Sequence, residues 1–188
     1  MEKVKFYESD FLVFNKVFMP RVETEKIIEI VSNYCISAVL HAPLIVEIGT
    51  GTGCIAISIK KKLSNSVVIA TDISVMALKN AYLNILFNKV SVGLVKNDIV
   101  SDWKKLPSSA EIIISNPPYV QWWEWISPEV IKKEPVLALY GNTSPLKIYM
   151  AIFEYGKKLK NLKGIFLESS PSLIEKLGEM AVKIFPEF

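Results

Sequence analysis

Histidine and cysteine are scarce in this 188-residue sequence, which contains one histidine, His41, and two cysteines, Cys35 and Cys54. One histidine cannot supply a metal site alone. The two cysteines have neither the spacing of a metal site nor the number that a disulfide framework needs. We therefore expect no metal ion and a reduced, cytoplasmic setting.

Long apolar runs and repeats are also missing. The first residues, Met1-Glu2-Lys3-Val4-Lys5, lack the apolar region of a secretory signal. No uncharged apolar run approaches the length of a membrane span. No internal repeat or low-complexity linker divides the chain. These absences predict a single domain over residues 1–188 with no membrane contact.

The sequence has no large excess of charge, since 22 Lys and Arg residues face 19 Asp and Glu residues and the net charge is +3. A strongly basic patch usually marks a nucleic-acid partner, and this charge is too small to identify one. The basic runs Lys60-Lys61-Lys62 and Lys132-Lys133 are more typical of a solvated helix end or loop. Apolar residues make up 51% of the chain, which is enough for a full α/β core at this length.

Residues 1–43 are predicted to form a hairpin followed by a helix. Residues 4–18 are apolar and aromatic but are broken at Glu8-Ser9-Asp10 and Asn15-Lys16, which indicates short strands joined by turns. The pattern then becomes helical from Glu23 to about Leu40, with apolar residues on one face and acids in the first turn.

Strands and helices alternate over residues 44–188, which we expect to form the cofactor-binding and catalytic core. Apolar runs predict strands at residues 44–48, 67–71, 91–95, 111–115 and 164–168. Helices are predicted over about 53–63, 74–87, 144–160 and 171–184. Such alternation predicts an α/β fold, with a mostly parallel sheet covered by helices on both faces. We expect strand order 3-2-1-4-5, with a topological switch between the first and fourth strands.

A glycine-rich turn, Gly49-Thr50-Gly51-Thr52-Gly53, follows the first of these strands. Glycines let the backbone turn sharply and let a ligand approach it closely, and the next helix aims its free N–H groups at the same place. A dinucleotide fingerprint would need a further glycine where Cys54 stands, so NAD is disfavoured. We predict that all five residues of the turn bind a cofactor.

Two acids are predicted at the ends of the next two strands. Asp72 stands at the end of the second strand, where a carboxylate can accept hydrogen bonds from both hydroxyls of a ribose. Asp98 can accept from an adenine amino group while Ile99 packs on the ring. The alternatives are a helix cap for Asp72 and an ordinary turn residue for Asp98. Together with the glycine-rich turn, these residues predict a pocket for an adenosine with a small charged tail.

The stretch Ser115-Asn116-Pro117-Pro118-Tyr119 ends the fourth strand. Two prolines cannot continue a strand, so the chain must leave the sheet in a stiff turn at the topological switch. There the Asn116 carboxamide and the Pro117 carbonyl can accept hydrogen bonds from both N–H groups of an amide or amino group. Tyr119 can pack against the flat face of that amide or of the base. We predict that Asn116, Pro117, Pro118 and Tyr119 bind the substrate. The alternative is a loop that only reverses the chain.

Three of the four tryptophans lie in the next segment, Gln121-Trp122-Trp123-Glu124-Trp125. These rings can form a stacking wall or a docking surface at the mouth of the pocket. The alternative is a loop that folds its aromatic residues back over the sheet. The sequence leaves both interpretations open.

Several of these stretches resemble one known family. The run from Val46 to Ala56 looks like motif I of class I S-adenosylmethionine methyltransferases, and Asn116-Pro117-Pro118-Tyr119 looks like their amino-group-methylating motif. Pro20-Arg21-Val22-Glu23-Thr24-Glu25 is similar to the Pro-Arg-Pro-Glu-Thr-Glu signature of the HemK/PrmC family, the release factor glutamine N5-methyltransferases. Glu134-Pro135 followed by Ala138-Leu139 matches a further element. The resemblance covers about residues 10 to 168.

The resemblance implies a Rossmann-like class I methyltransferase that uses S-adenosyl-L-methionine, bound by the glycine-rich turn, Asp72, Asp98, Ile99 and Asn116. It implies that Asn116, Pro117 and Tyr119 carry the methylation of a glutamine side-chain nitrogen, N5, in a peptide-chain release factor of translation termination. One alternative is an N6-adenine methyltransferase of RNA or DNA, because the same motif occurs there. Another is a shortened cofactor-binding homologue that is weakly active or not catalytic and needs a partner subunit.

The chain also departs from the family. We expect the helical N-terminal domain of bacterial members and strands six and seven of the sheet to be missing, and Ser169-Ser170 stands where the family has Ile-Gly. Some short relatives rely on a small activator subunit, and the mean hydropathy of +0.31 is high. We therefore expect the open edge of the fifth strand to be covered by such a subunit or by self-association. The alternative is that the last helix, Pro171 to Ile184, and residues 185–188 fold over that edge.

Overall fold

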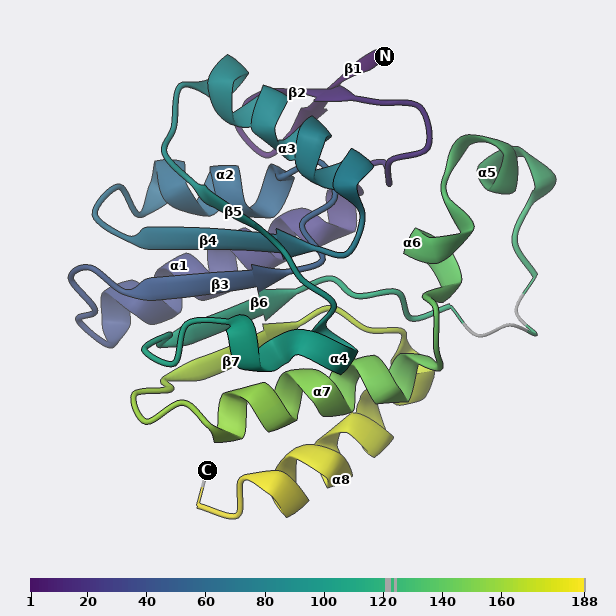
Figure 1. Ribbon diagram of the computed structural model, residues 1–188. Coiled ribbons are helices and arrows are strands. Elements are labelled where there is room, and N and C mark those ends of the chain that lie inside the picture. Colours follow the sequence, from purple (N-terminus) through teal and green to yellow (C-terminus); the bar gives the residue numbers. More distant parts are fainter. Residues whose placement is uncertain (121–122, 124, 188) are drawn as a thin grey trace.

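A parallel sheet forms the centre of the molecule (Figure 1). The computed structural model describes residues 1–120, 123 and 125–187, and within them this sheet has five strands in the order β5-β4-β3-β6-β7. This order confirms the predicted topology, with the switch between β3 and β6. The strands are β3 (Leu44–Ile48), β4 (Val67–Asp72), β5 (Gly93–Lys96), β6 (Ile112–Ser115) and β7 (Gly164–Leu167).

The register of the sheet places three strand ends side by side. Ile48 at the end of β3 pairs with Thr71 of β4 and with Ser115 of β6. The Ser115 hydroxyl donates to the Ile48 carbonyl at 2.7 Å, which joins β6 to β3 at this edge. The turns that follow β3, β4 and β6 therefore start close together, as ligand sites in open α/β sheets require.

Helices cover both faces of the sheet (Figure 1). The side chains of β7 show that both faces are covered. On one face, the ring of Phe166 lies 5.3 Å from the ring of Tyr34 in α1. Its neighbours Ile165 and Leu167 pack on the opposite side, against residues of α7 and α8. One face carries α1 (Glu25–Ser37), α2 (Cys54–Lys62) and α3 (Val75–Asn88). The other carries α4 (Ile99–Asp102) and α7 (Pro145–Lys157), with α8 (Ile174–Ile184) packed on α7.

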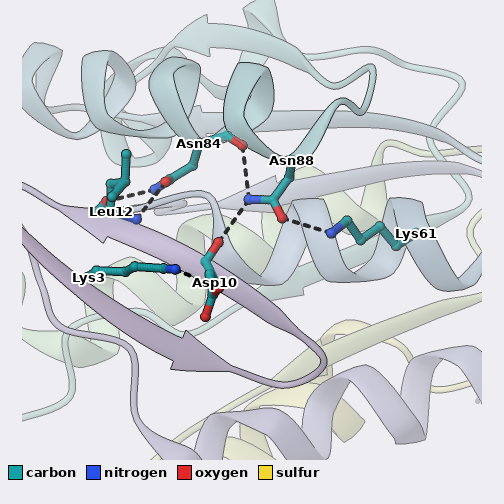
Figure 2. A network of polar contacts seen from close by, with 6 residues as sticks. All are labelled: Lys3, Asp10, Leu12, Lys61, Asn84 and Asn88. Carbon is teal, nitrogen blue, oxygen red and sulfur yellow. Dashed lines mark hydrogen bonds and ion pairs between the residues drawn. The ribbon is translucent and has the colours of Figure 1, made fainter.

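An N-terminal hairpin of β1 (Glu2–Phe6) and β2 (Ser9–Val13) lies against α3. Asparagines spaced one helical turn apart hold it there, as Figure 2 shows for Asn84 and Asn88. Asn84 Oδ1 accepts from the Leu12 N–H at 2.8 Å, and its Nδ2 donates to the carbonyls of Leu12 and Thr52, both at 2.9 Å. Asn88 Nδ2 donates to the Asp10 carbonyl at 3.1 Å. The backbone of β2 is thus bonded to helix side chains.

The N-terminal predictions are correct in type and shifted at their boundaries. Ser9 and Asp10, which the sequence placed in a turn, belong to β2, and the turn is formed at Tyr7 with φ 51°. Helix α1 ends at Ser37 instead of about Leu40, because the Leu40 N–H bonds the Cys35 carbonyl at 2.9 Å and closes the helix earlier.

Short helices were not predicted between β5 and α7. They are α4, α5 (Pro128–Lys133) and α6 (Val136–Tyr140), and each has six residues or fewer, too few for a helical periodicity to be recognised. Among the described residues, no helix has both the length and the apolar character that crossing a membrane requires. The expected cover for the outer edge of β7 stays a prediction.

Candidate active site

A cavity of about 320 Å³ lies at the carboxyl edge of the sheet, within the size range of small-molecule sites. Most of its lining comes from three groups of residues: the turns after β3, β4, β5 and β6, the segment before α1, and the segment around α6. The cavity brings together most of the predicted site residues, namely Gly49, Thr50, Gly51, Thr52, Asp72, Asp98, Ile99, Asn116, Pro117, Pro118 and Tyr119.

The glycine-rich turn has the open backbone that the sequence predicts. Gly49 and Gly51 have φ values of 75° and 57°, and a Cβ at either position would meet no atom within 4 Å. Gly53 is not among the described residues that line the cavity. It precedes α2 with φ 82°, and a Cβ there would lie 3.1 Å from the Ala81 Cβ. Gly53 therefore sets the close packing of α2 and α3.

Asp72 connects the glycine-rich turn to the start of α3. Its Oδ2 accepts from the Gly51 N–H at 2.9 Å, and its Oδ1 accepts from the Ser74 N–H at 2.8 Å. Burial raises the pKa of this carboxyl, while N–H groups of Ser74, Gly51 and Ile73 oppose the shift. Ser74 itself caps α3 by accepting from the Ala77 N–H. Because a carboxylate has about four lone-pair sites, Asp72 retains acceptor capacity for a ligand in the cavity.

Asp98 has a structural role as well as a place in the cavity wall. It is the N-cap of α4, and its Oδ1 accepts from the Val100 N–H at 3.0 Å. Ile99, which follows it, is buried and supplies an apolar surface to the cavity. The second carboxylate oxygen of Asp98 is the one that remains for a ligand amino group.

Asn116 is held by a residue far away in the sequence. Its Nδ2 donates to Thr24 Oγ1 at 3.1 Å across a separation of 92 positions. Thr24 belongs to the segment before α1, is 3% exposed and lines the cavity. Sequence reasoning missed Thr24 as a site residue. The signal that pointed to it was the Pro20–Glu25 stretch of the family resemblance.

Tyr119 forms a wall of the cavity and is connected to β7. Its hydroxyl donates to Glu168 Oε1 at 3.2 Å, and the Tyr149 hydroxyl donates to the Glu168 carbonyl at 2.7 Å. Burial and the negative charge of Glu168 raise the pKa of Tyr119 to about 12. The phenol is therefore neutral at physiological pH and supplies a flat ring and not a base.

Glu47 is a buried acid that sequence reasoning did not assign to the site. It is 1% exposed, and its Oε2 accepts from the Thr50 hydroxyl at 2.5 Å and from the Ala56 N–H at 3.2 Å. Burial raises its pKa to about 8, against the effect of these two donors. Its signal in the sequence was a charged residue inside the apolar run of β3.

An ion pair joins two segments that border the cavity. Arg21 Nη2 lies 2.5 Å from Glu134 Oε1, which connects the segment before α1 to the C-cap residue of α5, two positions before α6. Glu134 is 6% exposed, and burial raises its pKa while Arg21 opposes the shift. Both residues come from stretches of the family resemblance, but no sequence pattern predicts that they pair.

The tryptophan segment is described in part. Trp123 and Trp125 are 62% and 83% exposed, so neither ring folds back over the sheet. Gln121, Trp122 and Glu124 lie outside the described residues.

The family is shown by comparison with known proteins. Residues 24–132 match the model of the methyltransferase small domain family, which is more than half of the chain. The chain belongs to this methyltransferase family. Its fold also resembles that of solved methyltransferases, including the hMettl16 catalytic domain in complex with the MAT2A 3'UTR hairpin 6 (TM-score 0.69, 17% identity, 93% of this chain and 66% of that chain). Precorrin-6y C5,15-methyltransferase from Geobacter metallireducens is similar as well (TM-score 0.61, 13% identity, 93% and 76%). These likenesses confirm the class I methyltransferase fold.

Several curated methyltransferases match almost the whole of this chain. A release factor glutamine methyltransferase of Flavobacterium psychrophilum is 35% identical over 187 residues, which cover 96% of this chain and 65% of the relative. One of Dictyoglomus turgidum is 35% identical, covering 98% and 66%. A bifunctional methyltransferase of Rickettsia typhi is 34% identical, covering 94% of this chain and 38% of the relative. The chain thus spans less than two thirds of the length of these relatives.

Proposed function

We propose that this methyltransferase transfers a methyl group from S-adenosyl-L-methionine to the side-chain nitrogen of a glutamine in a peptide-chain release factor. One observation carries the proposal: the Asn116 carboxamide and the turn after β3 line the same cavity. An acceptor held at Asn116 would therefore lie beside a cofactor held at the glycine-rich turn. Relatives named release factor glutamine methyltransferase, at 35% identity, support the choice of acceptor.

The residues of the cavity fit the proposed cofactor. The two Asp72 oxygens have lone pairs for ribose hydroxyls, and Asp98 offers an acceptor beside the apolar side chain of Ile99. The open space at Gly49 and Gly51 permits close contact between a ligand and the backbone. When bound, S-adenosyl-L-methionine supplies a methyl group on a positively charged sulfur.

Positioning is the main task of the residues on the acceptor side. An amide nitrogen is a poor nucleophile because its lone pair is delocalised into the carbonyl. The Asn116 Oδ1 and the Pro117 carbonyl would accept hydrogen bonds from its two N–H groups, which fixes the nitrogen and favours its pyramidalisation. The ring of Tyr119, held through its hydroxyl by Glu168, would pack on the flat amide.

A second candidate is N6-methylation of adenine in RNA or DNA. It is favoured by the exposed rings of Trp123 and Trp125, which lie in the segment after the Asn-Pro-Pro-Tyr turn and are suited to stacking on bases. An exocyclic amino group would present its two N–H bonds to Asn116 and Pro117 in the same way.

A transfer assay separates the two candidates. The protein is incubated with methyl-labelled S-adenosyl-L-methionine and, separately, with release factor, transfer RNA and ribosomal RNA. Label on a release-factor glutamine, located by mass spectrometry, supports the proposal. Label on adenine instead supports the second candidate, and an Asn116→Ala variant controls for contaminating enzymes in either case.

A further inference from the structure

We propose that Thr24 is a positioning residue that fixes which end of the Asn116 carboxamide faces the acceptor. The inference deepens the proposed function and rests on it. Asn116 Nδ2 donates to Thr24 Oγ1 at 3.1 Å, and both residues line the cavity. Thr24 is 3% exposed, so its hydroxyl lies in the wall of the cavity, largely out of contact with water.

The orientation of the carboxamide decides whether Asn116 can hold an acceptor. A carboxamide has a donating NH₂ end and an accepting oxygen end, and the torsion that exchanges them is broad and roughly two-fold. The nitrogen of a glutamine amide presents two N–H bonds, so it needs the oxygen of Asn116. With Thr24 Oγ1 accepting from Nδ2, the Oδ1 is directed away from Thr24 and remains for the acceptor.

Both partners of this hydrogen bond are held in place before any ligand arrives. The Thr24 N–H donates to the Arg21 carbonyl at 3.1 Å, within the 3-10 turn Val22–Thr24 that leads into α1. Asn116 follows the buried strand β6, and Pro117 restricts its backbone further. A polar group that is aligned in advance costs no reorganisation at the moment of reaction.

A purely structural role for the Thr24 hydroxyl is not visible in the described part of the chain. Thr24 occupies the N-cap position of α1, yet its side chain forms no capping hydrogen bond there. The hydroxyl bonds the Asn116 side chain instead. Replacing Thr24 by valine, which has nearly the same shape, should therefore leave the helix intact and remove the contact with Asn116.

Kinetics of matched variants test the role. Thr24→Val should lower kcat about 5- to 10-fold, the size expected for one hydrogen bond, with an unchanged Kd for S-adenosyl-L-methionine. Thr24→Ser, which restores the hydroxyl, should stay within about twofold of the wild type. Val22→Thr, at a 74% exposed position of the same turn, controls for changes in the segment itself. In an Asn116→Ala background, Thr24→Val should cause no further loss, because Thr24 acts through Asn116.

A measurement without acceptor keeps the test independent of the proposed function. In NMR spectra, the side-chain NH₂ signals of Asn116, assigned by their loss in Asn116→Ala, should show one slowly exchanging, hydrogen-bonded proton. That protection should survive in Thr24→Ser and disappear in Thr24→Val, with Thr24→Ala as the substitute if the valine variant does not fold.

The outcomes separate the two ideas. Failure of the wild type to methylate glutamine overturns the proposed function, and the NMR comparison then decides the role of Thr24 by itself. An unprotected Asn116 NH₂ in the wild type overturns the inference. So does an unchanged kcat in Thr24→Val when the wild type is active, or an equal loss in both the presence and absence of Asn116.

Discussion

The cavity has a proposed cofactor side at the glycine-rich turn and a proposed acceptor side at Asn116, and the two sides are built in different ways. On the cofactor side, the glycine-rich turn is held mainly through its own backbone: the N–H groups of Gly49 and Thr50 bond the Thr71 carbonyl at 2.9 and 2.8 Å, and the Gly51 N–H bonds the Asp72 carboxylate. On the acceptor side, side chains connect remote segments, through the Asn116–Thr24 hydrogen bond and the Arg21–Glu134 ion pair. The first side follows from the fold, whereas the second depends on a few side chains that a single substitution can remove.

The largest expected effect on activity is on the acceptor side. Asn116→Ala should lower turnover about 10²-fold or more while leaving cofactor affinity nearly intact, because the lost contact matters most in the transition state. Rates with labelled cofactor and affinities by calorimetry check the two halves of this statement. Turnover near that of the wild type would remove Asn116 from the proposed mechanism.

The next effect should be confined to the cofactor side. Asp72→Ala should weaken S-adenosyl-L-methionine binding by about 1–3 kcal/mol, as expected for hydrogen bonds to a half-buried carboxylate. Calorimetry measures the change. Asp102→Ala, which removes an exposed partner of Lys105 at 2.8 Å, is the matched control and should leave the affinity unchanged. Unchanged binding in Asp72→Ala, or tighter binding of NAD than of S-adenosyl-L-methionine, contradicts the assignment.

The same difference explains what the sequence predicted. Periodic apolar runs predicted the sheet and its strand order, and the glycine-rich turn marked one wall of the cavity, because each feature is local and the fold then brings the strand ends together. The contacts of the acceptor side join residues 92 and 113 positions apart, and no local pattern pairs them. The short helices α5 and α6 have too few residues for a periodic signal. The sequence shows Glu47 as an acid within an apolar run, but it does not show that the side chain is buried, because the burial depends on helices that follow β3 in the chain.

A third prediction concerns Glu47, beneath the glycine-rich turn. Its pKa of about 8 means that the folded protein keeps a proton that the unfolded chain releases near pH 4.5. The folded state therefore binds more protons in this window. As the pH rises from about 4.5 to 8, the unfolding free energy of the wild type should therefore fall relative to that of Glu47→Gln. The fall should be at most about 1.4 kcal/mol per pH unit.

Urea unfolding at a series of pH values measures this difference. Glu175→Gln, at an exposed position of α8, serves as the control and should follow the wild type throughout. Parallel stability curves for the wild type and Glu47→Gln would show that the acid is ionised in the folded protein.

The smallest expected effect concerns the ion pair on the acceptor side. Arg21→Met removes the partner of Glu134 and frees the segment before α6 from the segment before α1. Glu134 is 6% exposed, but the Arg21 side chain is 39% exposed and solvent screens its charge, so the effect should be modest. We expect KM for the protein acceptor to rise about three- to fivefold, with the Kd for S-adenosyl-L-methionine changed less than about twofold. Lys105→Met breaks an exposed pair outside the cavity lining and should change neither value. If Arg21→Met weakens cofactor binding as much as acceptor binding, the two sides of the cavity are held by one network and the contrast between them does not exist.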